Sequence, residues 1–387
     1  MDFSILGITT IFILFTSFLL ALFLLTVKTS NKKANTFLGI YFLVFAIHIS
    51  VFFYHKYISL PPDLEMLRDH ISFFTSPLLF LYIISSIYSD FKLKPKHLLH
   101  LLPFIIQILI FSPRFYFADI STRNFLLENL NNTIEGRLSI IFGLFIALFY
   151  LVAMFLELRK YKQLLLENYS NKSVFNYKWL YQLLVILSVI YCFSLLKQLY
   201  KLYGTDVEIL NILRLTLTLF LLVFLTWIVL KSMYHPDLFR NISSEHRLAK
   251  KILIEDNILN KLEKDSSEDV NRLLEFMETE EPYLDATLTL QKLANKLELP
   301  NRDVSILINH NLNQHFFDFI NQFRIKKAQS ILQNPKNNQL TIQQIMYDVG
   351  FNSKSSFYTA FKKQTGVTPS EYRKTKDSIS QTSDNKE

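Results

Sequence analysis

Seven long apolar runs fill the first 230 residues and limit most strongly how this chain can fold. They lie at about 3–27, 36–54, 70–88, 97–112, 138–156, 179–200 and 209–230. Most of them approach the ~20 residues that a membrane-spanning helix needs, and only the fourth is clearly shorter. Because backbone polar groups in lipid must be satisfied within the segment, apolar runs of this length favour helices. We predict seven transmembrane helices over residues 1–230, and whether the fourth run spans stays open.

The loops between these runs predict the orientation of the bundle. Loops one, three and five carry eleven Lys or Arg residues, whereas loops two, four and six carry six. Because cytoplasmic loops are enriched in Lys and Arg, the amino terminus is expected outside and the carboxyl end in the cytoplasm. An odd number of spans agrees with this orientation. The expected location is the cytoplasmic (inner) membrane, with several passes through the lipid bilayer.

Four ionisable residues fall in the predicted outer halves of the spans: His48, His70, Lys197 and Arg214. Such residues are costly in a membrane, so each is a candidate for function. Together they could line an outward-facing pocket for an anionic or polar signal molecule. Equally, Lys197 and Arg214 lie near enough to the outer interface to extend their charges into water, and lone histidines usually pair with a neighbouring helix. The residues leave both interpretations open.

Several classes of function lack the residues that they require. The single cysteine, Cys192, excludes a disulfide or a cysteine-based zinc site within one chain. The seven glycines form no phosphate-binding cluster. No acidic residue lies in the middle of a span, and no HExxH-like cluster occurs. We therefore expect no enzyme activity, no cofactor and no metal.

The apolar runs stop in a linker predicted at residues 231–281. Residues 248–262 have helical periodicity, 270–277 form a short helical pattern, and an acidic break follows at 278–282. The linker is either a connector that transmits or dimerises, or a solvated spacer.

Residues 341–373 predict a helix, a tight turn and a second helix. Thr341 and Ser353 stand where helix caps are expected, and Gly350 and Gly366 where helices end. Residues 368–371 form a capping-box pattern that begins a further helix. The outer face of the second helix is basic and rich in hydroxyl groups, as in a helix that reads the DNA major groove. Three amphipathic helices with a solvated lysine face are the alternative.

A second pattern of this kind lies about 50 residues earlier in the chain. Thr289 caps a predicted helix, a turn follows at 298–300, and residues 301–309 form a second helix whose outer face carries Arg302, Ser305 and Asn309. A predicted helix over 315–332 joins the two patterns and spans roughly 25 Å. That length is close to the ~34 Å between successive major-groove faces.

The charge of this region supports a nucleic-acid partner. Between Arg324 and Lys376 the chain has ten Lys or Arg residues against two acidic residues, Asp348 and Glu371. A local excess of this size is typical of a surface that faces a phosphate backbone.

Residues 284–376 resemble the AraC/XylS-type DNA-binding domain. The resemblance rests on LTLQKLANKLELP, FFDFINQFRIKKAQSIL and GFNSKSSFYTAFKKQTGVTPSEYR. The segment EEPYLDATLTLQKLA also looks like the membrane-anchored variants of this family, although the membrane part is similar in layout alone. Departures from the family are Glu298 and Asn313 where glycine is common, Met346 where a small residue is common, and Ile306 where a long polar residue is common.

The resemblance implies which residues contact DNA. The expected base-reading residues are Arg302, Ser305, Lys354, Ser355 and Thr359, and the expected backbone contacts are Asn309, Lys362 and Lys363. Because Glu298 and Ile306 depart from the family pattern, we expect the second helix-turn-helix to be the main sequence reader.

Together these patterns predict an all-α chain with four parts. They are a seven-helix transmembrane sensor domain (1–230), a cytoplasmic linker (231–281), a double helix-turn-helix domain (282–376) and a disordered tail (377–387). The expected function is that of a membrane-embedded transcription regulator, which couples a membrane or extracytoplasmic signal to operator binding. Its expected partners are double-stranded DNA, the bilayer, an unknown signal molecule and a second copy in a homodimer. The alternative is a membrane transporter or adaptor protein with an accessory basic cytoplasmic domain.

Overall fold

The structure is a computed structural model that describes residues 5–27, 32–55, 57–88, 91–170, 177–204, 206–234 and 266–374. Within these residues the chain is mainly helical, and an isolated antiparallel bridge outside the helices pairs Tyr169 with Thr289. Contacts divide the chain into two compact units. The first holds residues 1–159 and 176–244, and the second holds 160–175 and 245–387.

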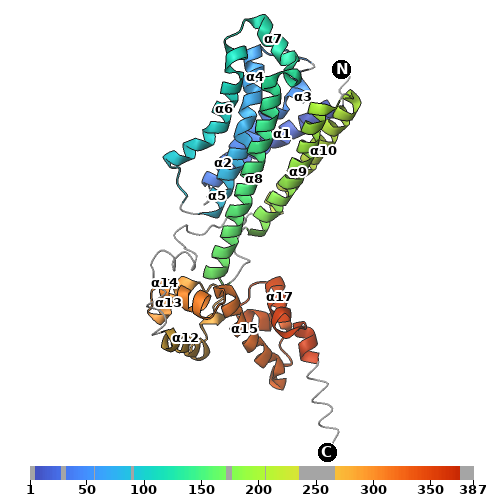
Figure 1. The fold of residues 1–387 in the computed structure, drawn as a ribbon. Coiled ribbons are helices and arrows are strands. Elements are labelled where there is room, and N and C mark those ends of the chain that lie inside the picture. The colour runs from blue at the N-terminus through green and yellow to red at the C-terminus, as the bar shows by residue number, and fades with distance from the viewer. Residues whose placement is uncertain are drawn as a thin grey trace, which may run out of the picture. The chain divides into compact units, whose positions relative to one another are not determined.

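The first unit contains the apolar helices (Figure 1). Seven helical stretches among the described residues are long and apolar enough to cross a membrane: 5–26, 32–54, 62–87, 95–116, 134–168, 177–203 and 207–231. The fourth stretch, 95–116, is therefore long enough to span. The elements are α1 (Ile5–Thr26), α2 (Lys32–Ile49), α3 (Val51–Tyr54), α4 (Pro62–Ile71), α5 (Thr75–Ile87), η2 (Pro95–Leu101), α6 (Leu102–Phe111), η3 (Ser112–Tyr116), α7 (Ile120–Glu128), α8 (Ile134–Asn168), α9 (Tyr177–Tyr203) and α10 (Val207–Tyr234), with short η1 (Ser72–Phe74) and η4 (Leu130–Asn132).

Helix α1 shows why these helices suit lipid. Its buried side includes several small residues, among them Thr10, Ser17 and Ala21, and α2 and α10 pack against this helix. Large apolar side chains such as Phe15 and Phe18 are exposed on the opposite side. Large apolar side chains on the exposed side are compatible with a helix that crosses a membrane.

The second unit contains the remaining helices. They are α12 (Ser266–Thr279), η7 (Pro282–Leu284), α13 (Leu290–Leu297), α14 (Asn301–Ile306), a π-helical turn η8 (Leu307–Asn311), α15 (Phe316–Gln333), η9 (Pro335–Asn337), α16 (Ile342–Asp348) and α17 (Lys354–Thr365). A further helical segment follows at residues 369–374. The last residues of α8 also belong to this unit.

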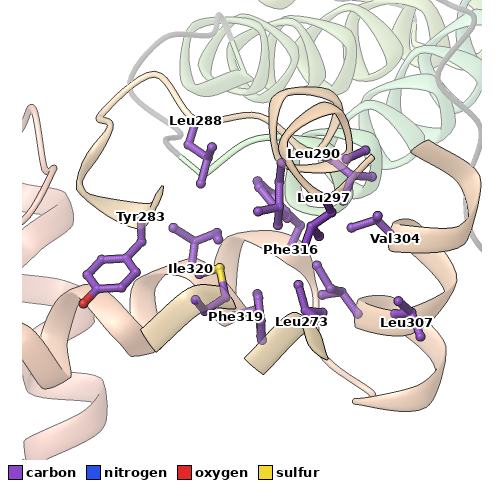
Figure 2. Packing of buried hydrophobic residues seen from close by; sticks show 14 residues of the cluster. Leu273, Tyr283, Leu288, Leu290, Leu297, Val304, Leu307, Phe316, Phe319 and Ile320 are labelled. Carbon is purple, nitrogen blue, oxygen red and sulfur yellow. The ribbon is translucent and has the colours of Figure 1, made fainter. Parts of the chain in front are cut away.

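Two hydrophobic cores build the second unit. The first core joins α12, α13, α14, η8 and the start of α15 (Figure 2), and its members include Leu273, Met277, Leu293, Val304 and Phe316. The second core joins the rest of α15 to α16 and α17, and its members include Ile325, Ala328, Ile345, Phe357 and Phe361. Each helix-turn-helix therefore has a core of its own, and α15 contributes to both.

Two features of the predicted linker can be compared with the structure. The short helix expected at 270–277 is part of α12, which is longer and packs into the first core through Leu273 and Met277. This segment thus folds together with the helix-turn-helix region. The helical pattern at 248–262 and the tail at 377–387 lie outside the described residues.

Candidate nucleic-acid interface

The second helix-turn-helix is formed by the local signals that the sequence carries. The Thr341 hydroxyl accepts a hydrogen bond from the amide of Gln344 at 3.1 Å, and the Gln344 side chain accepts one from the Thr341 amide at 2.8 Å. This is a complete capping box at the start of α16. The Ser353 hydroxyl caps α17 by accepting from the Ser356 amide at 3.2 Å. The predicted caps at Thr341 and Ser353 are confirmed.

Gly350 makes the tight turn between α16 and α17 possible. Its φ is +86°, a conformation that favours glycine. A Cβ atom at this position would lie 2.7 Å from the carbonyl oxygens of both Tyr283 and Leu284. The turn is therefore pressed against the segment that precedes the first helix-turn-helix, and only glycine leaves room for that approach.

Helix α17 presents the face expected of a reader helix. Phe357 and Phe361 are completely buried in the second core. Lys354, Ser355 and Thr359 are exposed, as the sequence predicts. These three side chains offer an ammonium donor and two hydroxyl groups that can donate or accept, which are suitable partners for base edges.

The two lysines near the end of α17 differ in their surroundings. Both Lys362 and Lys363 are exposed. The Lys363 ammonium forms an ion pair with Asp318 of α15 at 2.9 Å. The positive charge of Lys363 is thus partly balanced within the protein, which makes Lys362 the stronger candidate for a phosphate contact.

The first helix-turn-helix departs from the prediction on its second helix. Thr289 caps α13 as expected, with its hydroxyl accepting from the Lys292 amide at 3.2 Å, and Arg302 is exposed. The prediction that Ser305 faces outward is wrong, because its side chain is only 4% exposed. Asn309 is half-buried and donates to the Ser305 carbonyl and hydroxyl at 3.0 and 3.2 Å.

The physical reason is that α14 is covered on more than one side. Five consecutive residues, 304–308, are buried, whereas a helix packed on one side buries alternating groups. The π-helical turn η8 continues α14 and packs against α12. Ile306 is buried too, which explains an apolar residue at a position where a long polar one is common. Arg302 is the remaining outward candidate on this helix.

Arg324 stands at the junction of the two cores. Its side chain is 0% exposed, although the sequence counts it among the ten basic residues of this region. Its Nε donates to the Tyr283 carbonyl at 2.7 Å, its NH2 group donates to the Asp285 carbonyl at 2.9 Å, and its guanidinium lies 5.5 Å from the centre of the Phe351 ring. Burial lowers the pKa of Arg324 to about 10. This cation holds the domain together and does not face DNA.

Among the described residues, no hydrogen bond or ion pair joins the four candidates for a signal pocket to one another. The His48 carbonyl accepts a hydrogen bond from Arg68 at 3.0 Å, and Arg214 donates to the Asn211 side chain at 3.2 Å. His70 is buried among aromatic rings instead, 5.2 Å from Phe111 between ring centres. Its Nδ1 lies 3.2 Å from the Tyr116 hydroxyl.

The described residues hold no group of three or more His, Cys, Asp or Glu side chains that could bind a metal ion.

Known proteins resemble the second unit. A family described as a helix-turn-helix domain matches residues 293–375. The Msm operon regulatory protein of Streptococcus mutans serotype c is 34% identical over 89 residues, which is 23% of this chain and 31% of that protein. The uncharacterized HTH-type transcriptional regulator YdeC of Bacillus subtilis is 30% identical over 87 residues, which is 22% of this chain and 29% of that protein. This chain thus spans about a third of the length of these relatives.

A solved structure is also similar to part of this chain. It is the C-terminal domain of AraT, a response regulator from Geobacillus stearothermophilus, with 30% identity over 27% of this chain and 84% of that domain, and a TM-score of 0.24.

The fold and the family match define residues 293–375 as a helix-turn-helix domain, which is a DNA-binding fold. The carboxyl-terminal domain of this chain is thus similar to the helix-turn-helix domains of that family.

Proposed function

We propose that this chain is a membrane-embedded, sequence-specific regulator of transcription. The observation that carries the proposal is the exposed face of α17, which has basic and hydroxyl side chains. The opposite face of α17 is fixed in a buried aromatic core, within a domain that matches the helix-turn-helix family. A face of this kind has the size and the donor groups that the major groove admits.

The second helix-turn-helix is the main sequence reader in this proposal. Lys354, Ser355 and Thr359 contact base edges, and Lys362 contacts the phosphate backbone. The first helix-turn-helix contributes through Arg302, because Ser305 is buried and Asn309 is bonded to it. Backbone contacts then orient the protein while the face of α17 specifies the sequence.

The first unit lies in the membrane in this proposal. Support comes from its seven long apolar helices and from large apolar side chains exposed on them. The unequal distribution of Lys and Arg among the loops supports an outside amino terminus and a cytoplasmic DNA-binding domain. Reporter proteins fused after Glu387 test this orientation. A reporter active only in the cytoplasm is expected, and one active only in the periplasm would contradict it.

The signal is an anionic or polar molecule that meets His48, Lys197 and Arg214. Support comes from the cost of placing ionisable side chains on the apolar helices α2, α9 and α10, where these three residues lie. A ligand acts on DNA binding when it binds the DNA-competent and incompetent arrangements with different affinity. Two copies bound to paired sites raise the effective concentration of each, which favours a homodimer.

DNA selection with the full-length chain in lipid nanodiscs tests the central claim. A random duplex library is bound at moderate salt, recovered and sequenced over several rounds. Enrichment of a defined sequence is expected, and its occurrence in the genome then identifies the operators. Retention of DNA without any sequence preference would refute the proposal.

A further inference from the structure

The end of α8 is buried in the second unit, far from the rest of that unit in the sequence. Residues 160–175 belong to this unit although α8 begins in the first. Tyr161, Leu164 and Leu165 are almost completely buried. In the sequence this stretch looks like a basic loop after the fifth span, which would ordinarily be solvated. A loop that only connects two spans has no need to bury three large apolar side chains.

Directly after α8, the chain pairs with the entrance to the first helix-turn-helix. Tyr169 and Thr289 form an antiparallel bridge. The Ser170 amide and hydroxyl both donate to the Leu288 carbonyl, at 3.4 and 2.7 Å. Thr289 is the residue that caps α13. The end of α8 is therefore attached at the residue where the first helix-turn-helix begins.

Ser170 also completes the surroundings of Arg324. The Arg324 NH1 group donates to the Ser170 carbonyl at 3.3 Å, and NH2 donates to the Ser170 hydroxyl at 3.2 Å. The acceptors from the domain itself are the carbonyls of Tyr283 and Asp285. Two of the four hydrogen bonds of this buried guanidinium thus end on one residue that lies 154 positions away. A buried cation without these partners is costly, so loss of Ser170 would force the junction to rearrange.

Arg324 is placed where such a rearrangement affects both helix-turn-helix motifs. Tyr283 belongs to the first core and Phe351 to the second, and Arg324 contacts both residues. The Gly350 turn is packed against the carbonyl oxygens of Tyr283 and Leu284. The same cluster of residues thereby determines how the two reader helices are separated and oriented.

We propose that residues 160–170 act as a docking element that fixes the two helix-turn-helix motifs relative to each other, and that release of this element is how the membrane part controls DNA binding. The docked arrangement is the one that binds DNA. When the separation of the two helix-turn-helix motifs is already fixed, no conformational entropy is lost in ordering them as both bind their half-sites. The inference rests on the proposed DNA-binding function, and it adds the contact through which regulation acts.

Spacing of the two half-sites in the operator provides the test. Full-length protein in nanodiscs is titrated with the selected operator and with versions that carry one to three extra base pairs between the half-sites. The variants are Ser170→Ala and, as a matched control, Ser330→Ala, which removes a hydroxyl bonded to the Lys327 carbonyl on the exposed side of α15.

Ser170→Ala is expected to bind the native operator about tenfold more weakly, because it loses the hydroxyl's hydrogen bonds to the Arg324 guanidinium and to the Leu288 carbonyl. It is also expected to discriminate less between spacings than the unaltered chain does, whereas Ser330→Ala behaves as the unaltered chain. General destabilisation would weaken binding to every spacing alike. An unchanged spacing preference in Ser170→Ala, or tighter binding by it, would overturn the inference. Absence of any selected operator would instead refute the proposed function.

A cross-link gives an independent measurement if Ser170→Ala fails to fold. Tyr169→Cys and Thr289→Cys are combined in a Cys192→Ser background, because residues opposite each other in an antiparallel bridge are near enough for a disulfide. Operator DNA is expected to accelerate cross-linking, since coupling between two binding events is reciprocal. The oxidised protein is expected to bind the operator at least as tightly as its reduced form. A rate of cross-linking that operator DNA does not change would contradict the proposal, as would weaker operator binding by the oxidised protein.

Discussion

Lys363 of α17 and Asp318 of α15 form an ion pair at 2.9 Å, which joins the proposed reader helix to the helix that connects both motifs. The two side chains are 69% and 39% exposed, so the pair contributes little to stability. Its consequence is electrostatic, because a carboxylate next to a lysine reduces the attraction of that lysine for phosphate.

Asp318→Asn is therefore expected to strengthen binding to all DNA sequences alike. Removing the carboxylate frees the Lys363 charge for the phosphate backbone. The plot of the logarithm of the binding constant against the logarithm of salt concentration should then become steeper by about one unit, since about one more counterion is released. Fluorescence anisotropy on random duplex DNA at several salt concentrations measures this. In the matched double variant Asp318→Asn with Lys363→Gln the gain should disappear, and persistence of the gain would exclude Lys363 as its source.

Lys354→Ala and Lys362→Ala are expected to separate base reading from backbone contact. Loss of a base contact at Lys354 should reduce the free energy of binding to the operator by about 1–3 kcal/mol. It should also relax the base preference at one operator position. Loss of a phosphate contact at Lys362 should weaken binding to every sequence and reduce the salt slope by about one. Repeated DNA selection and salt titration measure the two effects. Equal losses on operator and random DNA for both variants would contradict this division.

Glu298→Gly is expected to stabilise the second unit. Glu298 ends α13 with φ at +57°, a left-handed conformation that costs a residue with a Cβ atom about 1–2 kcal/mol. Glycine removes this cost, but its greater conformational freedom stabilises the unfolded chain. The free energy of unfolding of this unit should therefore rise by about 1 kcal/mol in total. Hydrogen exchange of peptides from residues 266–374 measures the stability of this unit. Glu298→Ala keeps the Cβ atom and should bring no gain.

Gly350→Ala and Gly366→Ala are expected to destabilise the second unit by different amounts, although both glycines have positive φ. At Gly366, with φ at +81°, an added Cβ meets nothing within 4 Å, so the cost is the backbone strain of about 1 kcal/mol. At Gly350 the Cβ also meets two carbonyl oxygens at 2.7 Å, which adds about 1–3 kcal/mol for overpacking. The same hydrogen-exchange measurement compares the two variants. Similar losses would show that the approach of residues 283–284 to this turn is not tight.

Local signals in the sequence predicted the second helix-turn-helix well. Thr341 and Ser353 cap their helices, and Gly350 and Gly366 adopt the positive φ expected of residues that end a helix. These features depend on interactions within a few residues, so a short stretch of sequence contains the information that determines them.

Features that depend on contacts between distant parts of the chain could not be predicted from the sequence. Ser305 lies at a position that helical periodicity places outside, but α14 is covered on more than one side. Arg324 carries a charge that usually stays in solvent, and only the convergence of Tyr283, Asp285 and Ser170 allows it to be buried. No periodicity connects Ser170 with a residue 154 positions later, so the docking element could not be predicted from pattern alone.

The junction around Arg324 also has a consequence for how this domain loses its structure. A chain with two separate cores could melt in two stages, one for each helix-turn-helix. Here one buried guanidinium bonds to the segment that leads into the first core and lies against a ring of the second, and the Gly350 turn is pressed against that same segment. Neither half can open without exposing polar groups of the other, so α12 to α17 should unfold as one cooperative unit.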